Sequence, residues 1–356
     1  MHLHHPYSCT CGPPRVCVRS CRADSQGPCI SRHFADACWS ETTQHDTTRL
    51  EYEPVLNGVA KRHGEISREM FPGYSINSIT NGVHSATWSC DSFKALYDRH
   101  ITGWRNDPAM LRHAISIPGD EVWEAHRQAK QLLLNEVLRR TGTSLNPDAL
   151  TVGFARRATQ YKRADLVFSD LLQLRQIGRE AGAIEFVFAG KAHPNDEPGK
   201  DLIRRVFESA RELGPEIRVV YLENYDLDLA KLLTAGTDLW LNTPLRPQEA
   251  SGTSGMKAAH NGVPSFSILD GWWIEGCIEN VTGWSIGPMP GDRSAADNIN
   301  AADANDLYQK LRNVIVPTFY RSRGKWVEIR RHAMALNASF FNTHRMVQQY
   351  ATNAYL

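Results

Sequence analysis

Short apolar runs alternate with amphipathic segments through the second half of the chain. Five of these runs have the apolar, β-branched and aromatic content of buried strands, at residues 150–154, 184–189, 217–222, 239–241 and 265–269. Helical periodicity follows the first three runs, at residues 166–177, 201–213 and 227–233. Apolar strands separated by amphipathic helices are typical of a parallel sheet covered on both faces. The pattern therefore predicts an α/β fold with a doubly wound, Rossmann-like domain.

Further helices are predicted on either side of this domain. Residues 118–140 have an acidic first turn, which suits the positive end of a helix dipole, and then an apolar stripe. A shorter helix ends at Met70, before a Pro-Gly pair, and residues 306–316 and 326–336 predict closing helices. We therefore expect four segments: a leader at residues 1–52, an N-terminal part with the connecting helix at 53–145, the Rossmann-like domain at 146–300 and the closing helices at 301–356.

The charge balance gives no sign of an electrostatic partner. Lysine and arginine number 40 against 39 for aspartate and glutamate, so no field that attracts nucleic acid or a membrane surface is expected. No apolar run approaches the length of a membrane span, and the N-terminal sequence lacks the basic and apolar regions of a signal peptide. We therefore expect a soluble, cytoplasmic protein that binds neither nucleic acid nor membranes.

Cysteine is concentrated near the N-terminus. Six of the eight cysteines precede residue 40, namely Cys9, Cys11, Cys17, Cys21, Cys29 and Cys38. Four histidines lie nearby, so a zinc module is one interpretation, but the spacings do not form paired C-x-x-C knuckles. The segment also lacks helical or strand periodicity. We therefore interpret residues 1–52 as a disordered or non-native leader and predict no metal site.

Polar and charged groups follow every predicted strand. They are Arg156, Arg157, Lys162 and Arg163 after the first strand, Lys191 after the second, Glu223 and Tyr225 after the third, Glu249 and Lys257 after the fourth, and Asp270 after the fifth. Because parallel strands end at one edge of a sheet, these groups are expected to gather there. Cations, a carboxylate and aromatic rings together indicate a site for phosphate and a polar, ring-shaped substrate.

A small-residue turn at residues 251–255 lies between the fourth strand and a helix-forming segment that begins at Met256. Its backbone N–H groups could face one anion at the helix N-terminus. A carboxylate, Glu249, precedes the turn, and an amine, Lys257, follows it. The alternative is an ordinary strand-to-helix turn, with glycines for tight geometry and hydroxyls as caps.

The segment from Glu249 to Lys257, Glu-Ala-Ser-Gly-Thr-Ser-Gly-Met-Lys, closely resembles the pyridoxal-phosphate lysine motif of the α-glucan (glycogen, starch and maltodextrin) phosphorylases. Other segments resemble signatures of that family in the same order: Asn57-Gly-Val-Ala-x-x-His63, Thr80-Asn-Gly82 with Trp88, Arg156-Arg157 with Tyr161-Lys162-Arg163, Gly190-Lys191 and Glu223-Asn-Tyr225. The resemblance covers residue 57 to the C-terminus. Thr-Ser-Gly before the Met-Lys pair, and Asp270-Gly-Trp-Trp273, suggest the branch common in bacteria and archaea.

The resemblance implies the C-terminal Rossmann-like domain of a two-domain, B-type glycosyltransferase fold. It also implies phosphorolysis of terminal α-1,4-linked glucose to α-D-glucose 1-phosphate, with pyridoxal 5'-phosphate as cofactor and with α-1,4-glucan and inorganic phosphate as partners. A homo-oligomer is left open. In this family the cofactor phosphate performs the proton chemistry opposite the substrate phosphate.

The same resemblance implies roles for individual residues. Cofactor binding would fall to Lys257, Gly252, Thr253, Ser254, Arg156, Tyr225 and Trp88. The catalytic residues would be Arg157, Lys162, His63 and Glu249, and further substrate contacts would come from Asn81, Ser251 and Tyr161. Arg157 and Lys162 would clamp inorganic phosphate, because two phosphates brought together need cations.

The chain departs from the family pattern in two residues and in length. Asp226 stands where many members carry a basic residue, and Thr159 replaces a common histidine. Only residues 53–117 resemble the N-terminal domain, so we expect that domain to be largely missing and the isolated chain to have weak or no activity, since an open half-site cannot exclude water.

Two other functions compete with this interpretation. A nucleotide-sugar glycosyltransferase similar to glycogen synthase would share the sheet and a carboxylate near Glu249, but it would not need an amine at Lys257. An inactive glucan-binding fragment is the second alternative. A pyridoxal-phosphate aminotransferase is disfavoured, because its lysine is not paired with such a cationic clamp and glycine turn.

Overall fold

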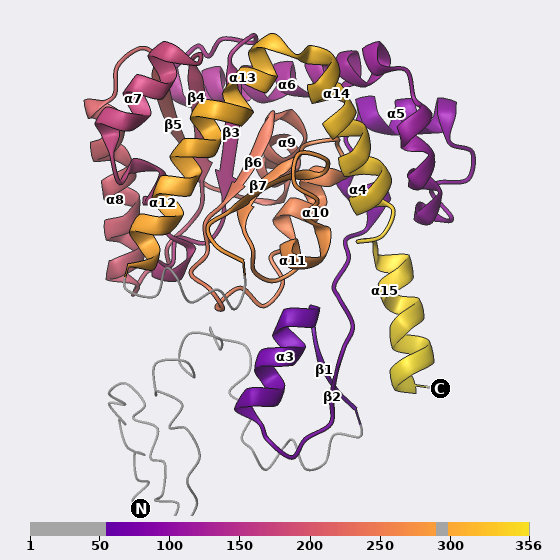
Figure 1. Ribbon diagram of the computed structural model, residues 1–356. Coiled ribbons are helices and arrows are strands. Elements are labelled where there is room, and N and C mark those ends of the chain that lie inside the picture. Colours follow the sequence, from indigo (N-terminus) through magenta and orange to yellow (C-terminus); the bar gives the residue numbers. More distant parts are fainter. Residues whose placement is uncertain (1–54, 290–297, 356) are drawn as a thin grey trace, which may run out of the picture.

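A parallel sheet of six strands organises the protein, in a computed structural model that describes residues 55–289 and 298–355 (Figure 1). The strand order is β5-β4-β3-β6-β7-β8, and every pair is parallel. The strands are β3 (Leu150–Ala155), β4 (Ile184–Ala189), β5 (Ile217–Leu222), β6 (Leu239–Asn242), β7 (Ser265–Ile268) and β8 (Gly283–Ile286). The order reverses between β3 and β6, which is where doubly wound sheets bind ligands. The predicted α/β fold is confirmed, whereas the cysteine-rich leader lies outside the described residues.

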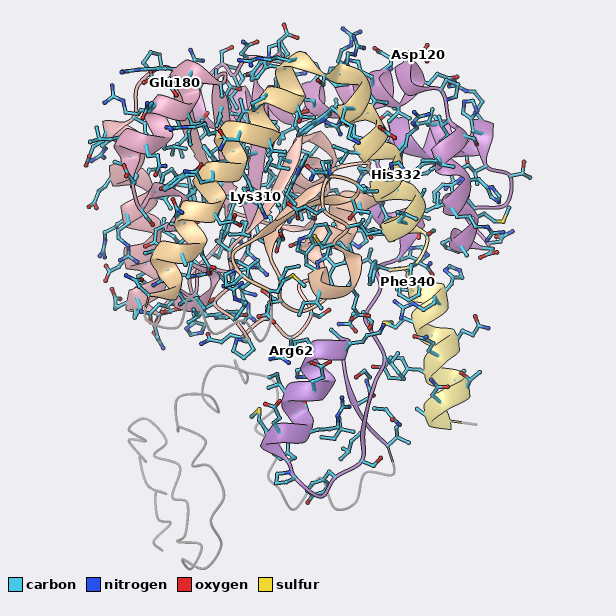
Figure 2. All side chains as sticks on the ribbon, in the orientation of Figure 1. Arg62, Asp120, Glu180, Lys310, His332 and Phe340 are labelled. Carbon is cyan, nitrogen blue, oxygen red and sulfur yellow. The ribbon has the colours of Figure 1, made fainter. Side chains whose placement is uncertain are left out.

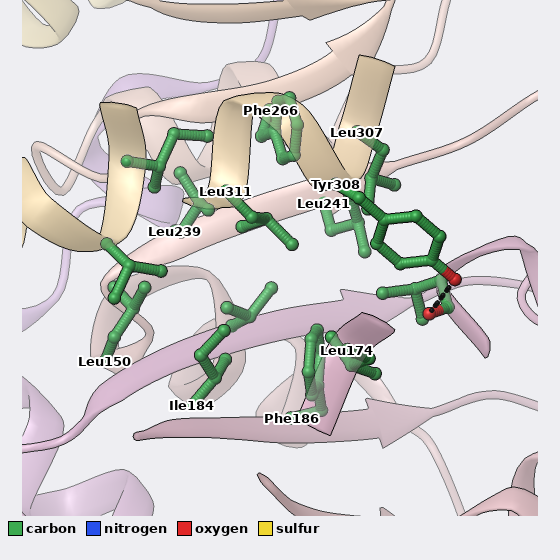
Figure 3. Close-up of a cluster of buried hydrophobic side chains, with 14 of the residues drawn as sticks. Leu150, Leu174, Ile184, Phe186, Leu239, Leu241, Phe266, Leu307, Tyr308 and Leu311 are labelled. Carbon is green, nitrogen blue, oxygen red and sulfur yellow. Dashed lines mark hydrogen bonds between the residues drawn. The ribbon is translucent and has the colours of Figure 1, made fainter. Parts of the chain in front are cut away.

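Helices cover both faces of this sheet. On one face lie α7 (Leu171–Glu180), α8 (Glu197–Glu212), α12 (Ile299–Lys310) and α13 (Val316–Arg321), and on the other lie α6 (Gly119–Thr141), α9 (Leu227–Gly236) and α10 (Ser254–Ala259). Figure 3 shows the first of these cores, where leucines of α12 and the following turn meet Leu150, Ile184 and Phe186 of the strands. The Tyr308 hydroxyl donates to the Val167 carbonyl (3.0 Å), so this buried ring keeps its polar atom paired.

Several predicted elements differ from the observed ones. The helix expected at residues 166–177 is broken, because the Asp170 side chain accepts from Gln173 N and starts α7 anew after a short 3₁₀ turn, Leu166–Phe168. Helix α8 begins at Glu197, four residues before the predicted start, since Asp196 caps it. Strand β8 was not predicted: its four residues, Gly-Trp-Ser-Ile, begin with a glycine, which is depleted in strands.

The closing helices are longer than predicted. Helix α12 continues through a π-helical turn, Leu311–Ile315, into α13. Helix α14 (Arg323–His332) likewise continues through a second such turn, Ala333–Ala338, and α15 (Thr343–Tyr350) follows. No helix in the described ranges is long and apolar enough to cross a membrane.

An N-terminal unit lies beside the sheet domain. It pairs β1 (Leu56–Gly58) with β2 (Ile76–Ser78) in parallel around α3 (Lys61–Met70). Gly58 is required there, because a Cβ atom at this position would lie 2.4 Å from the Gly64 nitrogen. The chain then runs through α4 (Ser85–Trp88), α5 (Asp91–His100) and a 3₁₀ segment, Pro108–Ser116, into α6.

Glu275 on α11 (Trp273–Gly276) joins this unit to the sheet domain. Its carboxylate accepts hydrogen bonds from the Lys61 backbone N–H (3.0 Å) and the Thr80 hydroxyl (2.9 Å). Figure 2 places Arg62 of α3 on the side of the unit that faces the sheet domain. The unit is therefore held at the same end of the sheet as the carboxyl ends of the strands.

At the opposite end of the sheet, Asp238 is the centre of a buried polar network. Its carboxylate accepts from Lys130 Nζ (2.7 Å), Arg330 Nη2 (2.9 Å) and the Thr151 backbone N–H (3.0 Å), and His126 Nε2 lies 2.9 Å away. All four side chains are almost fully buried. The network ties α6 and α14 to the amino ends of β3 and β6.

We predict that Asp238→Asn lowers the free energy of unfolding by roughly 3–5 kcal/mol, because two buried cations lose their counter-ion. Chemical denaturation followed by circular dichroism measures this loss. The matched control is Asp201→Asn, which breaks an exposed pair with Arg204 and should change stability by less than about 1 kcal/mol. Equal effects of the two substitutions would contradict the prediction.

The network also makes stability depend on pH. Burial, with the charge of Arg330, lowers the pKa of His126 to about 4 from its ordinary 6.5. Between these values the unfolded chain binds a proton that the folded chain does not, so acidification from pH 6.5 to 4 destabilises the fold. His126→Gln keeps a donor but cannot titrate. Its free energy of unfolding should therefore fall less steeply than that of the wild type over this range, and parallel curves would exclude this role for His126.

Candidate active site

Glu249 lies between two cations at the carboxyl edge of the sheet. Its Oε2 atom accepts from Arg156 Nη2 (2.5 Å) and from Lys162 Nζ (2.6 Å). Arg156 comes from the loop after β3, Lys162 ends the short 3₁₀ turn Gln160–Lys162, and Glu249 comes from the loop after β6. The three side chains therefore meet where the strand order reverses, whereas the sequence predicts only that such groups gather at the carboxyl edge of the sheet.

Burial shapes the charges of this cluster. The side chains of Arg156, Lys162 and Glu249 are 8%, 7% and 10% exposed. Burial, reinforced by the charge of Arg156, lowers the pKa of Lys162 to about 7, and Glu249 offsets this only in part. Burial opposes ionisation of Glu249 as well, but the two cations outweigh it and hold its pKa below the ordinary value. The cluster therefore holds the carboxylate in its charged form and weakens the hold of Lys162 on its proton.

Three buried polar atoms at this edge have no hydrogen-bond partner among the described residues. They are Arg156 Nη1, Ser251 Oγ and Thr159 Oγ1. Buried polar atoms are rarely left unpaired in a folded protein. These atoms are therefore groups that a polar ligand could satisfy.

The turn after Glu249 is hydrogen-bonded to the segment that follows β7. Asp270 accepts from the Glu249 backbone N–H (2.9 Å), and the Ser251 carbonyl accepts from the Trp272 N–H (2.8 Å). Gly271 has φ +53°, and a Cβ atom there would lie 2.5 Å from the Ser251 carbonyl oxygen. Burial raises the pKa of Asp270 to about 7. We did not predict this support, although the sequence places Asp270 directly after a strand.

Lys257 lies on α10, just beyond the turn. Its Nζ atom is 4.0 Å from the centroid of the Trp88 ring, and burial lowers the pKa of the amine. The amine makes no hydrogen bond or ion pair within residues 55–289 and 298–355. The backbone of Trp88 is anchored, because its carbonyl accepts from Nδ2 of Asn261, which follows α10 (2.8 Å). Lys257 is therefore a partly desolvated amine that lies against an aromatic ring.

The backbone of the turn offers donors next to this amine. Gly252 has φ +77°, a left-handed conformation that favours glycine. In the part of the chain that the structure describes, the N–H groups of Gly252, Thr253 and Ser254 donate to no protein acceptor. Ser254 Oγ instead accepts from the Trp240 indole N–H (3.0 Å).

Of the remaining predicted residues, Tyr225, Tyr161 and Arg157 lie near the Glu249 cluster. Tyr225 is near the cluster, since burial raises its pKa and the charge of Arg156 opposes that shift. Tyr161 places its ring 4.3 Å from Lys162 Nζ, and Arg157 lies close enough for its charge to help lower the pKa of Lys162.

His63 and Asn81 belong to the N-terminal unit. His63 Nδ1 accepts from the Val59 N–H (3.1 Å), and the Asn81 carbonyl accepts from Arg345 (2.9 Å). No described hydrogen bond joins either residue to Glu249, Lys162 or Lys257. The charge of Arg62 in this unit makes a small contribution that favours the ionised form of Asp270. No cluster of three potential metal ligands occurs in the described ranges.

Asp226, one of the departures from the family pattern, has a local structural role. Its side chain accepts from the Leu229 N–H (2.8 Å) and caps α9.

A family model and three relatives of this chain all indicate one family of proteins. The model of the Carbohydrate phosphorylase family matches residues 53–284. The maltodextrin phosphorylase of Thermococcus litoralis is 38% identical over 327 residues, covering 84% of this chain and 39% of that protein. The glycogen phosphorylase of Aquifex aeolicus is 37% identical over 343 residues, covering 86% and 48%. The glycogen phosphorylase of Mycobacterium tuberculosis is 36% identical over 335 residues, covering 84% and 38%. The chain thus spans less than half the length of these relatives.

We predict that Lys162 titrates near neutrality, with a midpoint near pH 7 for its ¹³Cε signal in lysine-labelled protein. Glu249→Gln should lower this midpoint, because the Glu249 charge favours the protonated amine. Loss of the signal in Lys162→Met identifies it. A midpoint above pH 9, or an upward shift in Glu249→Gln, would contradict the description of the cluster.

Proposed function

The chain belongs to the carbohydrate phosphorylase family, and we propose that it binds pyridoxal 5'-phosphate at Lys257 and acts in phosphorolysis of α-1,4-glucan. Its partners would be the glucan end and inorganic phosphate, and its product α-D-glucose 1-phosphate. We base this on one observation: a buried Glu249–Arg156–Lys162 cluster lies on the same edge as a half-buried, unpaired Lys257 amine.

The residues around Lys257 fit this cofactor. A planar pyridine ring matches the aromatic face of Trp88, and a phosphate group matches the free N–H groups of Gly252, Thr253 and Ser254. Arg156 Nη1 is a further unpaired donor beside the turn. When bound, the cofactor supplies a phosphate that exchanges a proton with the substrate phosphate. Tyr225, near Arg156, would complete the polar wall.

Lys162 and Arg157 would hold inorganic phosphate. An approaching dianion raises the pKa of a neighbouring amine, so Lys162 would become fully protonated as phosphate arrives. Glu249 occupies both Arg156 and Lys162 when no anion is present. Phosphate binding would therefore weaken these two contacts and leave the Glu249 carboxylate to accept glucosyl hydroxyls.

The sugar would be oriented by groups from both parts of the chain. Ser251 Oγ is buried and unpaired beside Glu249, so it can bond to a glucosyl hydroxyl. Tyr161 offers an aromatic face next to Lys162. His63 and Asn81 would hold the sugar near its reacting carbon from the N-terminal unit, which Glu275 keeps in place.

Borohydride reduction after incubation with pyridoxal 5'-phosphate tests the proposal. We expect a pyridoxyl group on the peptide that contains Lys257, because this amine is partly desolvated and of lowered pKa. Mass spectrometric peptide mapping measures it without any activity assay. Lys257→Ala should lose the adduct, whereas Lys200→Ala, a surface substitution on α8, should keep it. Equal labelling of surface lysines would reject the proposal and favour a nucleotide-sugar glycosyltransferase or an inactive glucan-binding fragment.

A further inference from the structure

A groove of about 820 Å³ lies beside β5, the edge strand of the sheet. Its walls come from the end of α6, from α8 and from the turn that follows β5. That turn contributes Glu223, Asn224 and Asp226 to the lining, whereas Tyr225, which is near Arg156, is not among the lining residues. The groove and the candidate active site thus share one turn but use different side chains of it.

An exposed aromatic face forms part of the groove. Phe207 of α8 is 41% exposed, and its ring centroid lies 5.2 Å from that of Tyr221 on β5, with 37° between the ring planes. The Phe207 ring thus packs against Tyr221 and remains partly exposed to water. Such a flat face complements the C–H face of a pyranose ring, which buries apolar area without burying hydroxyls.

The charged groups of the groove compensate one another. Arg139 and Arg140 both donate to Glu136, at 2.7 and 2.5 Å, and Arg140 Nη1 also donates to the Glu223 carbonyl (2.9 Å). Among the residues that line the groove, the two cations Arg139 and Arg140 are matched by two carboxylates, Glu223 and Asp226. The groove therefore carries no excess positive charge to attract a phosphorylated ligand. It offers fixed donors and acceptors to a neutral, hydroxyl-rich one.

The strand edge itself is partly covered. Arg218 Nη1 of β5 donates to the Ser144 carbonyl in the loop after α6 (2.7 Å), and Thr141 and Thr143 of the same region line the groove. These contacts leave less of the β5 edge open to pairing with a peptide strand. A ligand that stacks and bonds through side chains suits the groove better.

From these features we infer that the groove binds a short stretch of an α-1,4-glucan chain, apart from the site at Lys257. The choice of an α-glucan rests on the proposed function, whereas the neutral saccharide class rests on the aromatic face and the compensated charges. The groove would anchor a glucan chain while its end is free to occupy the site. It would thus raise the local concentration of chain ends.

Titration of the full chain with maltoheptaose, followed by calorimetry, tests this inference. Phe207→Leu keeps an apolar side chain against Tyr221 but removes the flat aromatic face, so its Kd for maltoheptaose should rise about tenfold. Phe207→Trp keeps a flat face, and its Kd should stay within about twofold of the wild-type value. Leu172→Ala, at another exposed apolar position on α7, should leave the Kd unchanged. Because the ligand is neutral, raising the NaCl concentration should also leave the Kd nearly unchanged.

Two results would overturn the inference: no maltoheptaose binding by the wild type, or equal Kd values for the wild type and Phe207→Leu. Lys257→Ala separates this inference from the proposed function. We expect it to lose the pyridoxyl adduct and to retain glucan binding at the groove. An adduct at Lys257 together with a Kd insensitive to Phe207→Leu would reject the groove and leave the proposed function standing.

Discussion

The buried Asp238 carboxylate is the interaction on which the position of the central strands depends. It draws Lys130 and His126 of α6 and Arg330 of α14 onto the amino ends of β3 and β6. A carboxylate buried this deeply is tolerated only because every neighbour bonds to it. Since β3 and β6 flank the reversal of strand order, fixing their amino ends also fixes where their carboxyl ends deliver Arg156 and Glu249.

The two ends of the sheet differ in how their charged groups are held. At the Asp238 end both carboxylate oxygens are bonded and the cations have a counter-ion, while His126 Nδ1 and Arg330 Nε are buried without a partner among the described residues. At the other end, Arg156 Nη1 and Ser251 Oγ are buried without a partner, and Lys162 is a buried amine with its pKa lowered to about 7. Unpaired buried atoms thus occur at both ends, and the feature that distinguishes the Glu249 end is a buried amine of lowered pKa, which is typical of functional sites.

Much of this arrangement could be predicted from sequence because parallel strands carry a local signal. The apolar runs at β4 and β5 match the observed bounds, since both strands are six-residue runs bounded by turns. Strand β8 begins with a glycine and so lacks the composition of a strand, although β6 and β7 are equally short and were predicted. The break before α7 depends on a side-chain cap at Asp170 rather than on periodicity.

For the site, the parallel arrangement of the strands predicted that the charged groups would gather at one edge of the sheet. It did not predict which of these groups form ion pairs. The contact of Glu249 with both Arg156 and Lys162 spans about ninety residues of sequence and depends on how the loops fold back. The support of the turn by Asp270 and Gly271 likewise arises from packing between two loops. Pairing of this kind is fixed by tertiary structure, so no local pattern encodes it.

Asp226 shows how one departure from a family pattern acts on two surfaces. In place of a basic residue, its carboxylate caps α9 and also lines the groove beside β5. The cap stabilises α9 locally, but it leaves the candidate active site with one cation fewer than the resemblance implies. Arg156 and the free N–H groups of residues 252–254 would then have to provide most of the attraction for a cofactor phosphate. The same residue adds negative charge to the groove, so one side chain would distinguish the proposed phosphate site from a groove without excess positive charge.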